Sequence, residues 1–253
     1  MTPAFIWPAY FFAVGAAIGS FLNVVIYRLP RGESVVRPGS HCYACNQPIR
    51  WYHNMPIISY FLLRGKCASC GAPFSPRYMF VELLTGILFA ACLIRFGLNA
   101  PAFVYMLLCA ALVAVFFIDL DHFLIPDVIT LPGIAVGFGC ALFVLPLSMT
   151  DAALGFVAGF GIFFLLAVAV PGGMGGGDIK LMGMLGLFLG LKAVLITIFL
   201  GSFIGAAIGL IGKLFFGKGS KIPFGPYLVA GALAALFFER EIIDTYLRLV
   251  LPK

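Results

Sequence analysis

Two aspartates in this chain have positions that could let them do chemistry together. Asp178 closes a stretch, residues 172–178, that holds five glycines, and Asp119 follows an apolar run at residues 102–118. Glycines let the backbone adopt conformations closed to other residues and let a neighbour approach closely. An ionisable side chain at the end of a membrane span is a candidate functional group. Asp119 and Asp178 are therefore the first candidates for a catalytic site.

Two apolar runs, residues 128–147 and 152–170, separate the two aspartates. Two crossings return the chain to the face it left, so we expect both carboxyl groups at the same membrane face and at similar depth. Two carboxylates at short range cannot both ionise cheaply, so one holds a proton while the other stays charged. Such a pair can activate a water as a base and protonate a leaving group as an acid, as aspartic peptidases do. The loop beside Asp178 would leave room for an extended substrate, and it consists of Gly175, Gly176 and Gly177.

A simpler interpretation treats the acids of this region as solvated loop residues or helix caps. Matched depth and the glycine run favour the catalytic interpretation for Asp119 and Asp178. For Asp121 and Asp127 both interpretations stay open, the alternative being support of the site or binding of a substrate leader.

Four cysteines form a second group of candidate site residues. They stand as two Cys-x-x-Cys pairs, Cys42 with Cys45 and Cys67 with Cys70, with 21 residues between the pairs. This spacing predicts a four-thiolate zinc site of the ribbon type, in which the metal helps a small domain to fold. A reducing cytoplasm disfavours disulfides, and a redox pair would need only one Cys-x-x-Cys. His41 could compete as a ligand, but four cysteines already complete the shell.

Membrane helices must position these residues. The composition of the chain indicates this. Of 253 residues, 62% are hydrophobic and 10% are charged, and the mean hydropathy is +1.10. A soluble domain carries roughly 25% charged residues. Residues 1–7 contain no Lys or Arg, so the basic region of a cleaved signal peptide is missing and the first apolar run is expected to be a retained span.

The pattern predicts an all-α polytopic membrane protein with about eight transmembrane helices. The expected spans are residues 3–27, 81–94, 102–118, 128–147, 152–170, 179–190, 193–212 and 224–238. Residues 28–78 hold seven Lys or Arg and one acid, Glu33, which places this loop in the cytoplasm. The expected organisation is a first helix at 1–27, a small cytoplasmic zinc-ribbon-like domain at 28–80 and a multi-span core at 81–253. A nucleic-acid partner is excluded, because the basic residues flank spans rather than forming a continuous stripe.

With these features in place, the chain closely resembles the bacterial type IV prepilin peptidases, a family of leader peptidases and N-methyltransferases in pilus and type II secretion systems. The resemblance covers nearly the whole chain. Besides the two cysteine pairs, it is carried by Gly19-Ser-Phe-Leu-Asn-Val-Val-Ile-Tyr-Arg28, Asn54-Met-Pro-Ile-Ile-Ser-Tyr60, Arg64-Gly-Lys-Cys67, Arg77-Tyr78, Val81-Glu82-Leu83, Ile118-Asp-Leu-Asp-His122, Gly175-Gly-Gly-Asp178 and Ile222-Pro-Phe-Gly-Pro-Tyr227.

The resemblance implies roles for particular residues. Asp119 and Asp178 would be the catalytic acids of a Gly-x-Gly-Asp peptidase in the bacterial inner (cytoplasmic) membrane. The substrate would be a prepilin or pseudopilin, whose basic leader would be drawn to Asp121, Asp127 and Glu82. The new N-terminus would be methylated with S-adenosylmethionine by an activity linked to the cysteine domain and, in this family, to the position of Gly65. No Gly-x-Gly-x-x-Gly element follows a predicted strand, so the sequence does not locate a pocket for the methyl donor.

Three other functions are compatible with part of the pattern. One is an intramembrane aspartyl protease for another leader, although the archaeal preflagellin type generally lacks the cysteine domain. Another is a transporter in which Asp119 and Asp178 relay protons or cations, but such a path favours acids spread through the depth of the spans. A zinc-bearing scaffold is the third, and it would have no use for a pair of acids at the membrane edge.

Overall fold

The computed structural model describes residues 5–170, 173–216 and 222–250. Within these ranges the chain is helical and contains no β-strand, and the only β pairing is two isolated bridges in the segment that holds the cysteines. The predicted all-α class is confirmed. The chain divides into two compact units, residues 1–114 and 115–253, and the division falls inside helix α4 (Ala100–His122).

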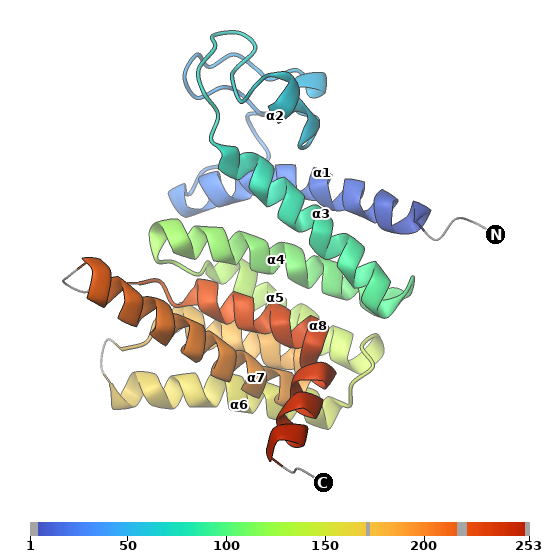
Figure 1. Ribbon diagram of the computed structural model, residues 1–253, viewed down its shortest axis with the longest axis vertical. Coiled ribbons are helices and arrows are strands. Elements are labelled where there is room, and N and C mark those ends of the chain that lie inside the picture. Colours follow the sequence, from blue (N-terminus) through green and yellow to red (C-terminus); the bar gives the residue numbers. More distant parts are fainter. Residues whose placement is uncertain (1–4, 171–172, 217–221, 251–253) are drawn as a thin grey trace. The chain divides into compact units, whose positions relative to one another are not determined.

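The first unit pairs helix α1 (Ile6–Arg28) with helix α3 (Pro76–Phe96). Figure 1 shows the chain between them, residues 29–75, at one end of the pair. This cysteine segment contains two 3-10 turns, η1 (Leu29–Arg31) and η2 (Trp51–His53), and the short helix α2 (Ile58–Leu62). Helix α3 begins inside the region predicted as the cytoplasmic domain.

Glycines let α1 and α3 approach closely. A Cβ added at Gly19 would lie 2.7 Å from the Cα of Glu82, and one added at Gly15 would lie 2.8 Å from the side chain of Phe89. Small residues four apart allow such contacts between membrane helices. Gly15 and Gly19 therefore mark the close contact between α1 and α3.

The second unit contains α5 (Asp127–Phe143), α6 (Met149–Ala169), α7 (Gly176–Phe216) and α8 (Gly225–Val250). Helix α7 packs against α5, α6 and α8, so it forms the centre of this unit. Gly190, with φ 81° and ψ 179°, interrupts α7. The two spans predicted at residues 179–190 and 193–212 are therefore the two parts of this broken helix. The mixed-charge tail that follows the last predicted span is helical as far as Val250, after a break at Phe238.

Five helices of the described chain are long and apolar enough to cross a membrane. They are Ile6–Arg31, Pro76–Phe96, Ala100–His122, Met149–Ala169 and Gly176–Phe215, and Asp127–Phe143 is a shorter apolar helix. At 1.5 Å per residue, the fifth candidate would be about 60 Å long if straight, roughly twice the hydrocarbon core of a bilayer. The break at Gly190 therefore leaves room for two crossings. The structure confirms a multi-pass membrane protein, and the count of about eight spans stays a prediction.

Two glycines of α6 predict opposite responses to the same substitution. A Cβ at Gly159 would overlap the carbonyl group of Met182 in α7, whereas a Cβ at Gly161 meets nothing within 4 Å. Gly159→Ala should force the two backbones apart and destabilise the protein by about 1–3 kcal/mol. Gly161→Ala should be neutral or slightly stabilising, because alanine favours helix. Melting temperatures of the purified variants in detergent test this, and equal values for the two would contradict the packing.

Candidate functional site

Asp119 lies in the last turn of α4, with 5% of its surface exposed. Its Oδ2 accepts a hydrogen bond from the backbone N–H of Gly225 at 2.9 Å. Gly225 is the first residue of α8, so this N–H belongs to the group of donors that a helix leaves unpaired at its N-terminus. The positive end of the helix dipole stabilises negative charge at this position. The structure thus provides Asp119 with a fixed partner for its carboxylate.

Asp178 lies in the first turn of α7, in the same unit as Asp119. Its backbone N–H donates to the carbonyl of Gly175 at 3.1 Å. The charges of the Asp178 and Asp119 carboxyl groups are close enough to interact. Among the described residues, Asp178 Oδ1 is buried and has no hydrogen-bond partner. An unpaired buried oxygen is costly for a structural carboxylate, so a chemical role for this group is favoured.

The glycines around the pair have steric roles that differ from one position to the next. A Cβ at Gly177 would lie 2.7 Å from the Cβ of Ile125, and one at Gly175 would lie 2.9 Å from Oδ2 of Asp178. A Cβ at Gly176 meets nothing within 4 Å. The glycine loop was expected to leave room for a substrate, and in the structure Gly177 makes room for Ile125. Gly172, the first residue of the glycine-rich stretch 172–178, lies outside the described residues.

Ile125 and Gly225 are site residues that the sequence reasoning missed. Ile125 is buried between the starts of α7 and α8, because it contacts the positions where a Cβ would stand at Gly177 and at Gly225 (3.2 Å). A Cβ at Gly225 would also lie 2.6 Å from Oδ2 of Asp119. The Pro-Phe-Gly-Pro stretch was part of the resemblance, but nothing in its pattern assigns Gly225 the role of a hydrogen-bond donor.

The three acids suggested for leader binding lie in different surroundings. Asp127 begins α5 and pairs with Lys180, whose Nζ lies 2.7 Å from both carboxylate oxygens. Asp121 is exposed near the end of α4. Glu82 is buried in the first unit, where its Oε2 accepts the N–H of Ile57 at 2.7 Å. Lys180, two residues after Asp178, was not singled out from the sequence.

The four cysteines of the two pairs come together. The Sγ atoms of Cys42, Cys45, Cys67 and Cys70 all lie within 4.8 Å of one another. Cys42 and Cys67 are buried, and Cys45 and Cys70 lie nearer the surface. The four thiols form a compact set that could hold one metal ion. The metal-binding potential expected from the spacing is therefore present in the fold.

Two similar turns build this cluster. In the first, Cys42 accepts the N–H of Asn46 at 2.8 Å, and in the second, Cys67 accepts that of Gly71 at 2.9 Å. Asn46 and Gly71 both have positive φ, 56° and 73°, as a tight reversal after each pair requires. Backbone N–H groups of Cys70 and then Ser69 lower the pKa of the Cys67 thiol to about 6. A stabilised thiolate is the form that binds a metal.

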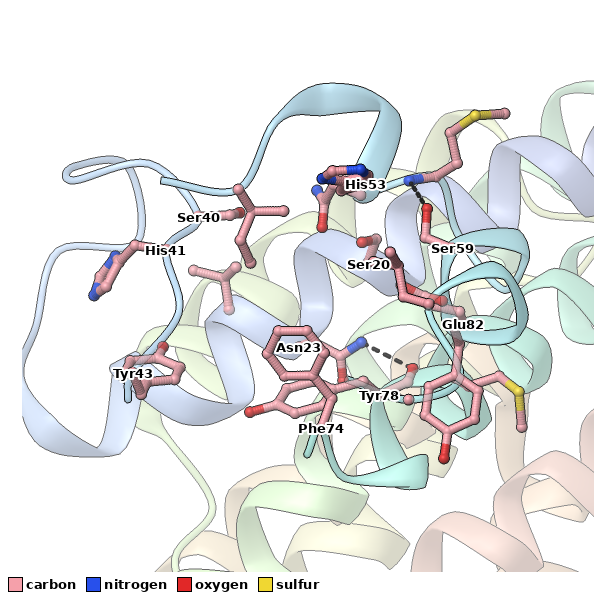
Figure 2. A pocket seen from close by; sticks show the side chains of 18 of the residues that line it. Ser20, Asn23, Ser40, His41, Tyr43, His53, Ser59, Phe74, Tyr78 and Glu82 are labelled. Atoms are coloured by element: carbon pink, nitrogen blue, oxygen red, sulfur yellow. Dashed lines mark hydrogen bonds between the residues drawn. The ribbon is translucent and has the colours of Figure 1, made fainter. Parts of the chain in front are cut away.

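A cavity of about 130 Å³ lies within the first unit, between α1, α3 and the cysteine segment. Figure 2 shows Ser20 and Glu82 toward one end, Tyr43 and His41 toward the other, and Asn23, Phe74 and Tyr78 between them. Gly65 also lines the cavity. The structure therefore places Gly65 with a buried acid and several aromatic rings, which its sequence position alone does not indicate.

Comparisons with known proteins find matches along most of the chain. A family model described as "Bacterial Peptidase A24 N-terminal domain" matches residues 13–96, and one described as "Type IV leader peptidase family" matches residues 106–210. No solved structure matches the chain.

Three relatives illustrate the similarity, and each is named "Prepilin leader peptidase/N-methyltransferase". The protein from Myxococcus xanthus is 40% identical over 221 residues, which is 84% of this chain but 65% of the relative. The protein from Pseudomonas aeruginosa is 37% identical over 93% of this chain and 91% of its own length. The protein from Neisseria gonorrhoeae is 38% identical over 85% of this chain and 85% of its own length. The identity and coverage show that this chain belongs to the type IV leader peptidase family.

Proposed function

We propose that this protein removes the leader from prepilin or pseudopilin substrates and methylates the N-terminus that cleavage creates. The relatives' names support both activities, and they favour a peptidase over the transporter. The observation that carries the proposal is the pair of aspartates at the ends of two helices in one unit, with Asp119 held by Gly225 and Asp178 left with an unpaired buried oxygen.

The surroundings of the two aspartates suggest that they have different catalytic roles. The N–H of Gly225 stabilises a charged Asp119, because a hydrogen bond to a carboxylate favours its ionised form. We therefore assign Asp119 as the base that takes a proton from the attacking water. Asp178 would hold the proton that polarises the scissile carbonyl, since its Oδ1 lacks a protein donor in the described chain. Collapse of the tetrahedral intermediate then transfers a proton to the leaving amine.

The substrate would reach this site from the membrane. Prepilins in this family carry a basic leader followed by an apolar helix, so the helix would enter from lipid while the leader stays in the cytoplasm. Asp121, exposed near the end of α4, is suited to attract the leader. Asp127, at the start of α5, is exposed too, but its charge is already paired with that of Lys180, so its contribution is expected to be smaller. Glu82 is buried against Ile57, so we assign it to the first unit's own structure.

The charge pattern of the sequence predicts on which side of the membrane the cysteine segment lies. Seven Lys or Arg in residues 28–78 favour the cytoplasmic side of the bacterial inner membrane for the cysteine segment. We propose zinc as the metal of the four cysteines, because Zn²⁺ favours tetrahedral thiolate sites. S-adenosylmethionine would supply the methyl group.

Removing either carboxyl group should stop leader removal. Asp119→Asn and Asp178→Asn should each lower the cleavage rate at least about 100-fold, the contribution expected of a general acid or base. Asp244→Asn, an exposed change in α8, is the matched control and should cleave at the wild-type rate. Mass measurement of a co-expressed pilin N-terminus reports cleavage. Normal cleavage by either catalytic variant would contradict the two-aspartate mechanism.

Neighbouring glycines of the loop should respond differently to alanine. Gly177→Ala places a methyl group against Ile125 and should reduce cleavage about tenfold by displacing the start of α7, consistent with an overpacking cost of about 1–3 kcal/mol. Gly176→Ala meets open space and should cleave normally. Equal loss in both single variants would refute this steric account.

The metal proposal predicts one zinc ion per chain in the purified protein. Cys45→Ser or Cys67→Ser should abolish stoichiometric zinc, because three thiolates and a hydroxyl bind zinc poorly. Cys140→Ser, in α5, should retain it. Elemental analysis of the three variants gives the answer. Wild-type protein purified under non-chelating conditions with no stoichiometric zinc would contradict the assignment.

A further inference from the structure

The short helix α2 of the cysteine segment has an exposed apolar face. Ile58, Phe61 and Leu62 are 51%, 65% and 73% exposed. They stand at positions i, i+3 and i+4, so they share one side of the helix. We call these three residues the α2 face. Large apolar side chains gathered in this way on a surface mark a site that another apolar surface covers.

The opposite side of α2 is fixed to its own segment. Buried Ser59 accepts the N–H of Met55 through its Oγ at 2.9 Å and donates to the carbonyl of Tyr52 at 3.2 Å. Tyr60 lies over Gly65, where an added Cβ would stand 3.1 Å from Cζ and Oη of the ring. The N–H of Gly65 donates to the carbonyl of Tyr60 at 2.8 Å. The helix therefore cannot turn its apolar face inward without breaking these contacts.

A strained turn fixes the start of α2 against α3. Oε2 of Glu82 accepts the N–H of Ile57 at 2.7 Å, and the φ of 63° and ψ of −52° at Ile57 are rare for a β-branched residue. The N–H of Ile58 donates to the carbonyl of Pro56 at 2.6 Å, which closes a tight three-residue turn. Such strain persists only where the surroundings impose it. The contact with Glu82 is thus a firm anchor point for α2.

This anchor point lies alongside the membrane-spanning helices. Glu82 follows Arg77 by about 7–8 Å along the axis of α3, at 1.5 Å per residue. In α1 it meets Gly19, which precedes Arg28 by about 13 Å on the same scale. Ile57 is therefore held beside the first two turns of α3, and Figure 1 shows α2 level with α3 rather than beyond its end. Interfacial helices bury their apolar face about 5–10 Å below the bilayer surface, which matches this depth.

The charge around the α2 face suits one kind of surface. Residues 34–81 contain five Lys or Arg and no Asp or Glu. Exposed Arg64 and Lys66 follow the α2 face directly, and exposed Arg50 precedes it beside Trp51. Basic side chains next to a membrane attract anionic phospholipid headgroups, and tryptophan is enriched at the membrane–water interface. The same charge would repel a basic peptide.

We propose that the α2 face inserts into the anionic phospholipid leaflet of the membrane that α1 and α3 span. Acyl chains cover Ile58, Phe61 and Leu62, while Arg64 and Lys66 meet the phosphate groups. The cysteine segment then rests on the bilayer and does not project freely into the cytoplasm. The four cysteines are thereby held at a fixed height above the lipid. This surface is independent of both proposed enzymatic activities.

Single tryptophans in the full-length protein test the insertion. The chain has two, Trp7 and Trp51, and changing both to Phe gives a background without tryptophan. Phe61→Trp then places the probe on the α2 face. Val36→Trp is the matched control, because Val36 is 76% exposed in the same segment but lies beyond the end of α1. In vesicles of phosphatidylglycerol and phosphatidylethanolamine with brominated acyl chains, fluorescence should fall at least about twofold at position 61 and little at position 36.

The lipid headgroup and a second probe complete the test. Vesicles of brominated phosphatidylcholine alone should quench the probe at position 61 less, because the basic residues lose their anionic partners. Melting temperatures verify that the variants are folded, and Leu62→Trp replaces Phe61→Trp if that variant is unstable. Equal quenching at positions 61 and 36, or equal access of acrylamide to both, would overturn the proposal. Protection of position 61 only after a prepilin is added would also overturn it, because a protein would then cover the α2 face.

Discussion

The hydrogen bond from Gly225 to Asp119 is the interaction on which the proposed peptidase site depends. A carboxylate buried in so apolar a chain needs a fixed donor, and the free N–H groups at the start of α8 provide one. To reach it, α8 must begin beside the end of α4, where only a glycine fits against the carboxylate. Ile125 then fills the space between Gly225 and Gly177, which positions the start of α7 and therefore Asp178. The backbones of three helix ends together define the pair.

A different pair of buried charges organises the first unit. Arg28, at the end of α1 with 3% of its surface exposed, donates to the carbonyls of Ser34, Pro38 and Gly39 at 3.1, 2.7 and 3.3 Å. Glu82 of α3 holds the other side of the cysteine segment through Ile57. Each charge compensates its burial with backbone hydrogen bonds. The cysteine segment is thus attached to two membrane helices at defined points, and Arg28 and Glu82 both line the cavity between them.

Glycine has several distinct uses in this protein, which a count of glycines cannot separate. Gly159 allows two helices to touch, Gly190 breaks a helix, and Gly65 keeps an aromatic ring in place. Gly176, in the most glycine-rich stretch, has open space around its Cβ position. The glycine loop therefore depends less on glycine content than on the neighbour that each position meets, and only the fold supplies those neighbours.

Composition and spacing by themselves determined the class of this protein: its all-helical, multi-pass character, the grouping of four cysteines, and the candidate pair Asp119 and Asp178. These features are local or periodic, so they can be recognised without knowing which segments meet. Which segments meet was decided by tertiary structure. Gly225, 106 residues from Asp119, becomes its donor, and Lys180 neutralises Asp127 across 53 residues. Glu82, expected near a basic leader, instead supports a strained turn and a cavity. These outcomes depend on how helix ends converge, and pairing over such separations leaves no pattern in a single sequence.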